Sequence, residues 1–326
     1  MKHLQYILMM TVIVLLAACS QDSAEEAVES EASLHLSHVT RALSSEPDYG
    51  DIRIFLTHGT TATEGLFEYV GTSAWTTQLK LKSGARTYQL YGYMPDNAGL
   101  TSSISDWNDN GAVLHIRPMP PMATQDYCIV TGVRQASDEN DNHAAVRGAF
   151  NFDYDSQREN YVNLFLDHLY SHVIFCMKVG DDYNAVRTIK VKRMKLQVAN
   201  ISSCDVDITL TKDVGISKLD HNVSGTEASE QIIRNEELTL TTAYTTLCSS
   251  YILPATNLIN NLCLVIDYDI YDKRGNKIAE RTATNKLAYS LDELQQGEER
   301  TLLINIDPSY LYDLSQEDPP IVIIKN

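Results

Sequence analysis

The chain has 326 residues, of which 44% are hydrophobic and 21% are charged, and its formal net charge is -17 at pH 7. The hydrophobic share is sufficient for a globular body, and the length suits two domains of ~140 residues each beyond an N-terminal leader. The negative charge argues against nucleic acid and anionic lipid headgroups as partners, because both would be repelled.

The first 18 residues are typical of a lipoprotein signal peptide. A short basic start, Lys2-His3, leads into an apolar run that ends at Leu16 and is too short for a membrane span of ~20 residues. Small residues, Ala17-Ala18, then precede Cys19, as the lipid-transfer enzyme and the peptidase behind it require. A general secretory cleavage site, with Cys19 incidental, is the competing interpretation. We expect the mature chain to begin at a lipidated Cys19 and to be held on a membrane by that lipid.

The segment 19–46 reads as a lipidated tether that ends in a strand. Residues 20–33 are small and acidic, and such a segment cannot bury enough apolar surface to offset the entropy of ordering it. Leu34 and Leu36 then alternate with polar residues, which is a strand pattern. Arg41 follows as the one basic residue of this segment. An isolated arginine in an exposed segment is an easy target for a protease.

From residue 47 onward the sequence predicts an all-β chain of antiparallel sandwiches, because strand patterns alternate with Gly, Pro and Asn breaks. In 188–198 the apolar phase changes, which predicts a β-bulge near Arg193. Arg274-Gly275-Asn276 predicts a hairpin turn, and a capping-box pattern at Ser290 predicts a short helix before Gly297. The predicted strands are 52–57, 78–82, 88–93, 112–116, 127–133, 161–166, 172–179, 188–198, 262–270, 277–282 and 302–306.

We divide the chain into a signal peptide (1–18), a tether with an N-terminal strand (19–46), an N-terminal β-sandwich (47–166) and a C-terminal β-sandwich (167–326). At the far end two prolines precede the apolar run Ile321-Val322-Ile323-Ile324. An unpaired β-branched segment of this kind is an aggregation hazard. It is either the last strand of its own domain or an added strand in the sheet of a partner.

The motifs of common enzymes are absent from the sequence. It contains no Gly-x-Ser-x-Gly, no His-Glu-x-x-His, no phosphate-binding glycine loop and no dinucleotide fingerprint. We therefore expect no enzyme and no cofactor. Asp106, Asn108, Asn110 and Gly111 fit the first half of a calcium loop, but Arg117 stands where the bidentate glutamate belongs. A polar turn before a strand is the favoured interpretation, and no metal is expected there.

Histidine and cysteine offer no metal motif either. His168 and His172 are four residues apart, which on a strand is a separation of about 13 Å. Cys128, Cys176 and Cys263 lie within apolar runs, where a thiol packs as a small hydrophobic group. We expect these cysteines to be packing residues.

Two tryptophans and 18 tyrosines could line a sugar-binding face. The tryptophans are Trp75 and Trp107. Covering the sheets of a secreted β-sandwich explains the same residues, and we prefer that interpretation.

Several segments together resemble the fimbrillin family, the lipoprotein pilins of the Bacteroidales type that form type V pili. They are the lipobox, the acidic tether, Val39-Thr40-Arg41-Ala42, Ala74-Trp75, Tyr91-Gly92-Tyr93-Met94-Pro95, and His168-x-x-Ser171-x-Val173 leading into an apolar strand. The resemblance implies an N-terminal and a C-terminal transthyretin-like β-sandwich. It also implies export as a lipoprotein to the cell outer membrane, with Cys19 carrying the lipid.

The resemblance further implies assembly by strand exchange. An arginine-specific protease would cut after Arg41, leaving Ala42 as the new N-terminus and removing Leu34 to Val39 as the first strand. A strand from another pilus subunit would fill the groove, and Ile321 to Ile324 is a candidate donor.

Three other roles stay open. Anchor subunits of such pili keep their lipid and are not processed, and tip subunits need not donate a strand. The chain is shorter than we would expect of a major stalk subunit, so accessory, tip and anchor positions all remain. An uncleaved surface lipoprotein that binds a glycan or a host ligand is the alternative from a different class.

Overall fold

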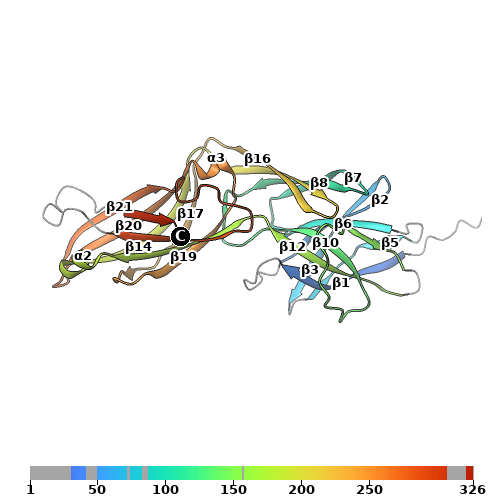
Figure 1. Cartoon of the computed structure of the whole chain (residues 1–326), viewed down its shortest axis with the longest axis horizontal. Coiled ribbons are helices and arrows are strands. Elements are labelled where there is room, and N and C mark those ends of the chain that lie inside the picture. Colours follow the sequence, from blue (N-terminus) through green and yellow to red (C-terminus); the bar gives the residue numbers. More distant parts are fainter. Residues whose placement is uncertain are drawn as a thin grey trace, which may run out of the picture.

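The computed structural model describes residues 31–41, 50–71, 74–82, 87–155, 158–306 and 321–325. These residues form an elongated molecule made almost entirely of strands (Figure 1). Their two helices are short, α2 (Asp181–Val186) and α3 (Thr256–Ile259). No helix in the described ranges is long and apolar enough to cross a membrane. The predicted all-β class is confirmed.

The largest sheet contains the N-terminal strand. Its order is β4 (Ala74–Thr76), β3 (Thr61–Gly71), β2 (Ile52–His58), β6 (Thr87–Met94), β10 (Cys128–Ala136), β12 (Asn160–His168), β1 (Glu31–Arg41) and β5 (Lys80–Lys82), with β11 (Asn151–Asp153) beside β6. Although β4 and β1 are far apart in this order, they contact each other, so the sheet curls around one apolar face.

The curled face encloses a buried cluster that we call the N-terminal core. It consists of Leu34, Ile52, Ile54, Leu56, Phe67, Trp75, Leu79, Leu81, Tyr88, Leu90, Met94, Cys128, Val130, Val133, Phe152, Val162, Leu164 and Leu166. The opposite face of the same sheet is also buried, since Phe55, Tyr91 and Ile129 belong to a second cluster. Burial on both faces explains why β2 is almost continuously buried from Ile54 to Thr57.

The other strands form three smaller sheets. The first has the order β16 (Gly215–Ser224), β15 (Ser203–Thr211), β8 (Gly111–Met119) and β7 (Thr101–Asn108). The second has the order β23 (Ile321–Lys325), β22 (Glu299–Ile306), β13 (Ser171–Val179), β19 (Thr245–Ile252) and β9 (Met122–Ala123). The third has the order β17 (Ser229–Arg234), β14 (Arg187–Val198), β20 (Leu262–Asp272) and β21 (Lys277–Lys286), with β18 (Leu238–Thr239) beside β14. Most pairs are antiparallel, but β1·β12 and β13·β22 are parallel.

The periodicity in the C-terminal half predicted local detail correctly. The register of β14 against β20 shifts between Val191 and Arg193, which is the expected bulge. The predicted hairpin is β20–β21, and Gly275 supplies the positive φ of its turn, 87°.

The prediction of a short helix at Ser290 is wrong. Residues 288–293 form turns instead, and the left-handed φ of Glu293, 54°, ends any helical geometry there.

Two sheets cross the predicted domain boundary at residue 166: β9 of the N-terminal half pairs with β19, and β8 pairs with β15. The β15–β16 hairpin comes from the C-terminal half, but β15 pairs along most of its length with β8 of the N-terminal half (Figure 1). At this junction Gly111 has a φ of 143°, and a Cβ there would lie 1.9 Å from the Leu210 carbonyl oxygen. Only glycine allows so close an approach. The second core therefore continues from one half of the molecule into the other.

Candidate functional site

Strand β1 lies inside the largest sheet, between β12 and β5. It runs parallel to β12 from Leu34 opposite Asn160 to Arg41 opposite Leu166. Its first residues pair antiparallel with β5, from Glu31 opposite Lys82 to Ser33 opposite Lys80. The first described strand of the chain is thus enclosed by two later ones.

One face of β1 completes the N-terminal core. Leu34 is 1% exposed, and Leu36 and Val39 are half-buried against the same core. The register against β12 shifts between Leu36 and His38, so Ser37 is an extra residue. That bulge explains why the apolar side chains change from even to odd positions and still meet one core. Burying a leucine fully stabilises a fold by about 1.5–3 kcal/mol.

The other contacts of β1 are polar or aromatic. The ring centroids of His35 and Tyr161 lie 4.9 Å apart across the β1·β12 pair. Lys80 Nζ donates a hydrogen bond to Ser33 Oγ at 2.7 Å. Ser37 Oγ donates to the carbonyl oxygen of Asp138 at 2.8 Å. The bulge therefore contacts the 137–143 loop.

Asp141 holds that loop together. Its carboxylate, which is 3% exposed, accepts hydrogen bonds from the Arg134 guanidinium at 2.9 Å and from the backbone N–H of Ser137 and His143. The Arg134 hydrogen bond, followed by those backbone donors, lowers the pKa of Asp141 far below its usual range. Asn163 of β12 donates to the Asp141 carbonyl oxygen, which ties the loop to the strand that β1 pairs with.

The position of β1 makes it separable from the rest of the fold. It precedes every other described strand, so one cut behind it disconnects it without interrupting any later strand. Its loss would leave the β12 edge unpaired and would remove the strand pairing of β5, which is described with β1 alone. Leu81 of β5 and Leu164 of β12 would lose the cover of Leu34 and its neighbours in the core. The result is a strand-sized apolar groove with a free hydrogen-bonding edge.

The sequence-predicted site residues lie at both ends of the chain. Arg41 is the last residue of β1, whereas Cys19 and Ala42 lie outside the described residues. The strand is longer than the predicted Leu34 to Val39 and runs from Glu31 to Arg41. The residues Ile321 to Ile324 form most of β23, which pairs antiparallel with β22 from Ile306 opposite Ile321 to Leu302 opposite Lys325.

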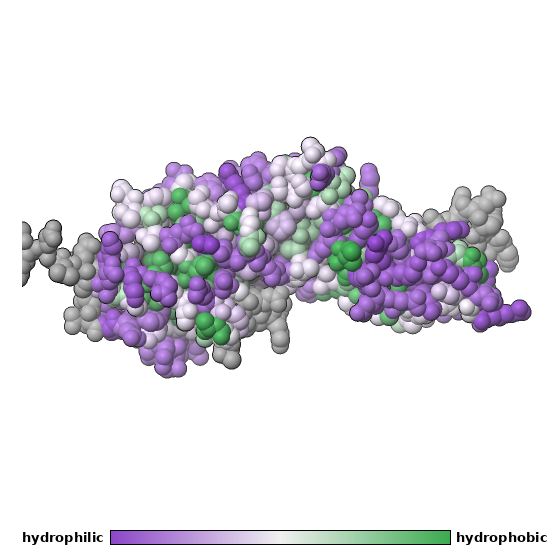
Figure 2. Space-filling model, turned by 180° about the vertical axis from the view of Figure 1, so that it is seen from behind, coloured by the Kyte–Doolittle hydropathy of each residue, from purple (hydrophilic) through white to green (hydrophobic). Residues whose placement is uncertain are grey.

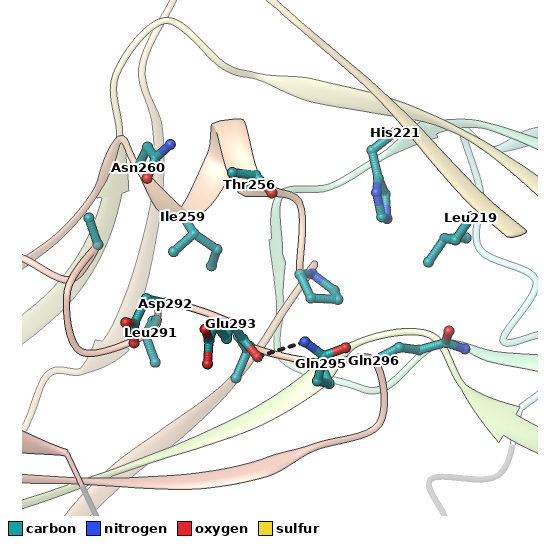
Figure 3. Close-up of a pocket in the computed structure, with 13 residues that line it drawn as sticks. Leu219, His221, Thr256, Ile259, Asn260, Leu291, Asp292, Glu293, Gln295 and Gln296 are labelled. Atoms are coloured by element: carbon teal, nitrogen blue, oxygen red, sulfur yellow. Dashed lines mark hydrogen bonds between the residues drawn. The ribbon is translucent and has the colours of Figure 1, made fainter.

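A cavity of about 410 Å³ lies between β16, α3 and the 288–296 segment (Figure 3). His221 and Leu219 reach into it from β16, opposite Glu293 and Gln295. Burial lowers the pKa of His221. No aromatic side chain other than this imidazole lines the cavity, so it does not provide the aromatic face considered above.

A second cavity, of about 460 Å³, has an indole in its wall. Trp107 lines it together with His58, Gln89 and Asp109, and the Trp107 Nε1–H donates to the Gly59 carbonyl oxygen at 3.0 Å. Trp75, by contrast, is buried in the N-terminal core. Trp107 therefore fits the interpretation of a sugar-binding face, whereas Trp75 fits the interpretation of a packing residue.

The calcium-like run is the turn between β7 and β8. Asn108 pairs with Gly111 across it, and the Asn108 side chain accepts a hydrogen bond from the Asn110 N–H at 2.8 Å. The predicted polar turn is confirmed. The metal-ligand cluster found within the described ranges is elsewhere, at Asp126, Cys128 and His168.

The outer surface offers little apolar area on the face seen in Figure 2, where hydrophobic residues form small separate patches on a hydrophilic background. Several of the exposed apolar side chains among the described residues are valines, such as Val70 and Val146. Scattered apolar residues of this kind are normal on a monomer and do not mark an interface.

The chain matches no protein-family model and no curated protein sequence. It is similar to the solved structure of a fimbrial protein from Bacteroides vulgatus, with 13% identity and a TM-score of 0.48, over 91% of this chain and 98% of that one. It is also similar to the fimbrial anchor protein Mfa2 from Porphyromonas gingivalis, with 10% identity and a TM-score of 0.33, over 90% of this chain and 97% of that one.

Proposed function

We propose that this protein is a non-enzymatic structural subunit of a cell-surface pilus that serves adhesion. It is exported as a lipoprotein through Cys19 to the outer membrane, cut after Arg41 by an arginine-specific protease, and assembled by strand exchange. The observation that supports this most is the placement of β1, a separable first strand that fills the core through Leu34 and ends at Arg41. The lipobox and the fimbrillin-like segments of the sequence support the same function.

In this proposal β1 occupies the groove until a neighbouring subunit replaces it. Main-chain hydrogen bonds along the β12 edge give the joint its strength, and the pockets left by Leu34, Leu36 and Val39 give it selectivity. Strand β23 is the proposed donor. It would leave β22 of its own chain and enter the groove of the next subunit.

The test is to fix β1 covalently in its groove. His35 and Tyr161 are a cross-strand pair with neighbouring rings. We expect the double variant His35→Cys/Tyr161→Cys to form a disulfide, to be cut after Arg41 as readily as the wild type, and to yield no polymer until a reductant is added. Mass spectrometry of the N-terminus, expected at Ala42, and gel analysis of polymers measure the two steps separately.

The matched control is the single variant His35→Cys, which should be cut and should polymerise with or without reductant. Polymers that assemble from the oxidised double variant would refute strand exchange at this groove. Polymers whose subunits still begin at acylated Cys19 would refute the cleavage step and would favour an uncleaved anchor.

Glycan or host-ligand binding by an uncleaved surface lipoprotein is a second candidate function, favoured by the cavity at Trp107. Its wall combines an indole ring with amide and carboxylate groups, a mixture suited to sugar rings and hydroxyls. Trp107→Ala should then abolish binding to a glycan panel, while Tyr289→Ala, at a side chain that is 83% exposed elsewhere, should not. Retained binding by Trp107→Ala would exclude this cavity.

A further inference from the structure

Three side chains of metal-ligating type converge where β10 begins and β12 ends. Cys128 lies directly opposite His168 in the antiparallel register of these strands. Asp126 precedes Cys128 by two residues and reaches the same point. All three are buried, with exposed fractions of 4% for Asp126, 0% for Cys128 and 7% for His168.

Their ligand atoms are spaced for one ion. Cys128 Sγ lies 3.1 Å from Asp126 Oδ2 and 3.9 Å from His168 Nδ1, and this Oδ2 and Nδ1 are in close contact. In a tetrahedral zinc site, Zn–S of ~2.3 Å and Zn–N or Zn–O of ~2.0 Å place sulfur about 3.5 Å from the other ligands. The two sulfur distances lie on either side of that value. The imidazole and the carboxylate need only separate to about 3.3 Å to admit the ion.

The cluster also leaves buried polar atoms without partners. Asp126 Oδ1 and His168 Nε2 are both inaccessible to solvent and accept or donate no hydrogen bond among the described residues. Such atoms are costly in a protein interior. A divalent cation bound by the Asp126 carboxylate, the Cys128 thiolate and a neutral His168 gives zero net charge, and binding through both carboxylate oxygens would supply a partner for Asp126 Oδ1.

An entry path adjoins the cluster. His168 also lines a surface cavity of about 290 Å³, together with Arg147, Asp167 and Gln296. This cavity has room for a water molecule, which is a common fourth ligand of zinc.

We propose that Asp126, Cys128 and His168 bind one divalent transition-metal ion of the zinc class. The sulfur and nitrogen ligands favour zinc over calcium and magnesium, which take oxygen ligands. The ion joins the start of β10 to the end of β12 and so fastens the strand on which β1 lies.

The experiment uses the metal-free full chain carrying Cys19→Ser, so that the N-terminal thiol does not compete. Zn²⁺ titration by calorimetry should show one ion per chain, and Zn²⁺ should raise the melting temperature. Co²⁺ should give a thiolate-to-metal charge-transfer band and tetrahedral ligand-field bands. Asp126→Asn, Cys128→Ser and His168→Gln should each weaken Zn²⁺ binding by at least about 100-fold, since even outer-shell changes at metal sites cost 10–100-fold.

The matched control is Cys176→Ser, which removes another buried thiol, on β13, without touching the cluster. It should bind Zn²⁺ and Co²⁺ like the parent protein. The proposal is overturned if the parent protein binds no Zn²⁺, if its Co²⁺ complex lacks the thiolate band, or if Cys128→Ser binds Zn²⁺ unchanged. The Co²⁺ spectrum of the parent decides the matter even where a variant fails to fold.

Discussion

At the scale of single residues, Leu34 is the side chain of β1 that contributes most to anchoring this strand in the N-terminal core. It is the fully buried side chain of a strand whose other apolar residues, Leu36 and Val39, are only half-buried. Around it the polar contacts of Ser33 and Ser37 are exposed and individually weak. Among the side chains of β1, Leu34 therefore supplies most of the apolar anchoring, in addition to the main-chain pairing with β12 and β5.

Truncation of that side chain should loosen the whole strand. Leu34→Ala leaves a cavity in the N-terminal core and is expected to lower the free energy of unfolding by about 2–5 kcal/mol. Urea unfolding measures this loss, and limited proteolysis after Arg41 should become faster. Val70→Ala, at a side chain that is 60% exposed, should change stability by less than about 0.5 kcal/mol. An equal effect of the two substitutions would contradict the role given to Leu34.

The hydrogen bonds of the Asp141 carboxylate predict that the stability of the fold declines in acid. Hydrogen bonds from Arg134 and from backbone N–H groups depress its pKa from the ordinary 3.8, so its stabilising contribution is complete well above pH 3.8. That contribution declines as the pH falls from 3.8 toward the depressed pKa. Asp141→Asn should therefore be clearly less stable than the wild type at pH 7, and the difference should shrink by pH 3 in urea unfolding curves. Glu139→Gln, at an exposed neighbour, should follow the wild type throughout. A pH-independent difference would assign the effect of Asp141→Asn to shape alone.

At the scale of elements, alternation predicted which residues are buried but not which strands pair. The bulge in β14 and the β20–β21 hairpin follow from local phase and turn residues, and both are confirmed. The parallel pairing of β1 with β12 joins residues over 120 positions apart, and nothing in the pattern around Leu34 indicates that partner. The cluster at Asp126, Cys128 and His168 was missed for the same reason. Only the register of β10 against β12 brings its members together.

Strand β23 provides a prediction at this scale. Deletion of residues 321–326 removes one edge strand, and β22 still pairs with β13 along its length. The shortened protein should keep its melting temperature within a few degrees and should form no polymer. Electron microscopy after treatment with the protease is the readout. Polymers formed by the deletion variant would place the donor strand elsewhere.

At the scale of the whole molecule, the sheet that contains β8 and β15 couples the two halves. Sequence division at residue 166 separates β8 from β15, whereas the structure pairs them and buries Cys204, Val206, Ile208 and Leu210 at the junction. Composition and length suggested two sandwiches. Neither composition nor length could predict that a hairpin from one half pairs with a strand from the other. Cutting the chain at residue 166 therefore separates two paired central strands and does not merely divide a linker.

Residues 167–326 expressed alone should therefore fold incompletely. In hydrogen–deuterium exchange the β15 amides that donate to β8 are expected to be protected in the full chain and to exchange rapidly in the fragment, because β8 is missing there, whereas the amides that donate to β16 keep their partner. The amides of β14 and β20, which pair within the fragment, should stay protected and serve as the internal control. Protection of the β8-facing amides of β15 in the fragment would show that the C-terminal half is independent of β8.

The β8·β15 pairing also determines how the molecule carries tension. Both strands run roughly along its long axis (Figure 1), and the hydrogen bonds of an antiparallel pair are perpendicular to the strands. A force that slides the two halves apart along this axis would therefore load these bonds in shear, beside the backbone that runs directly from β12 into β13, and would not open them one after another. In the proposed pilus, drag from flowing liquid would then meet a sheared strand pair in every subunit, which resists force better than bonds that open in turn.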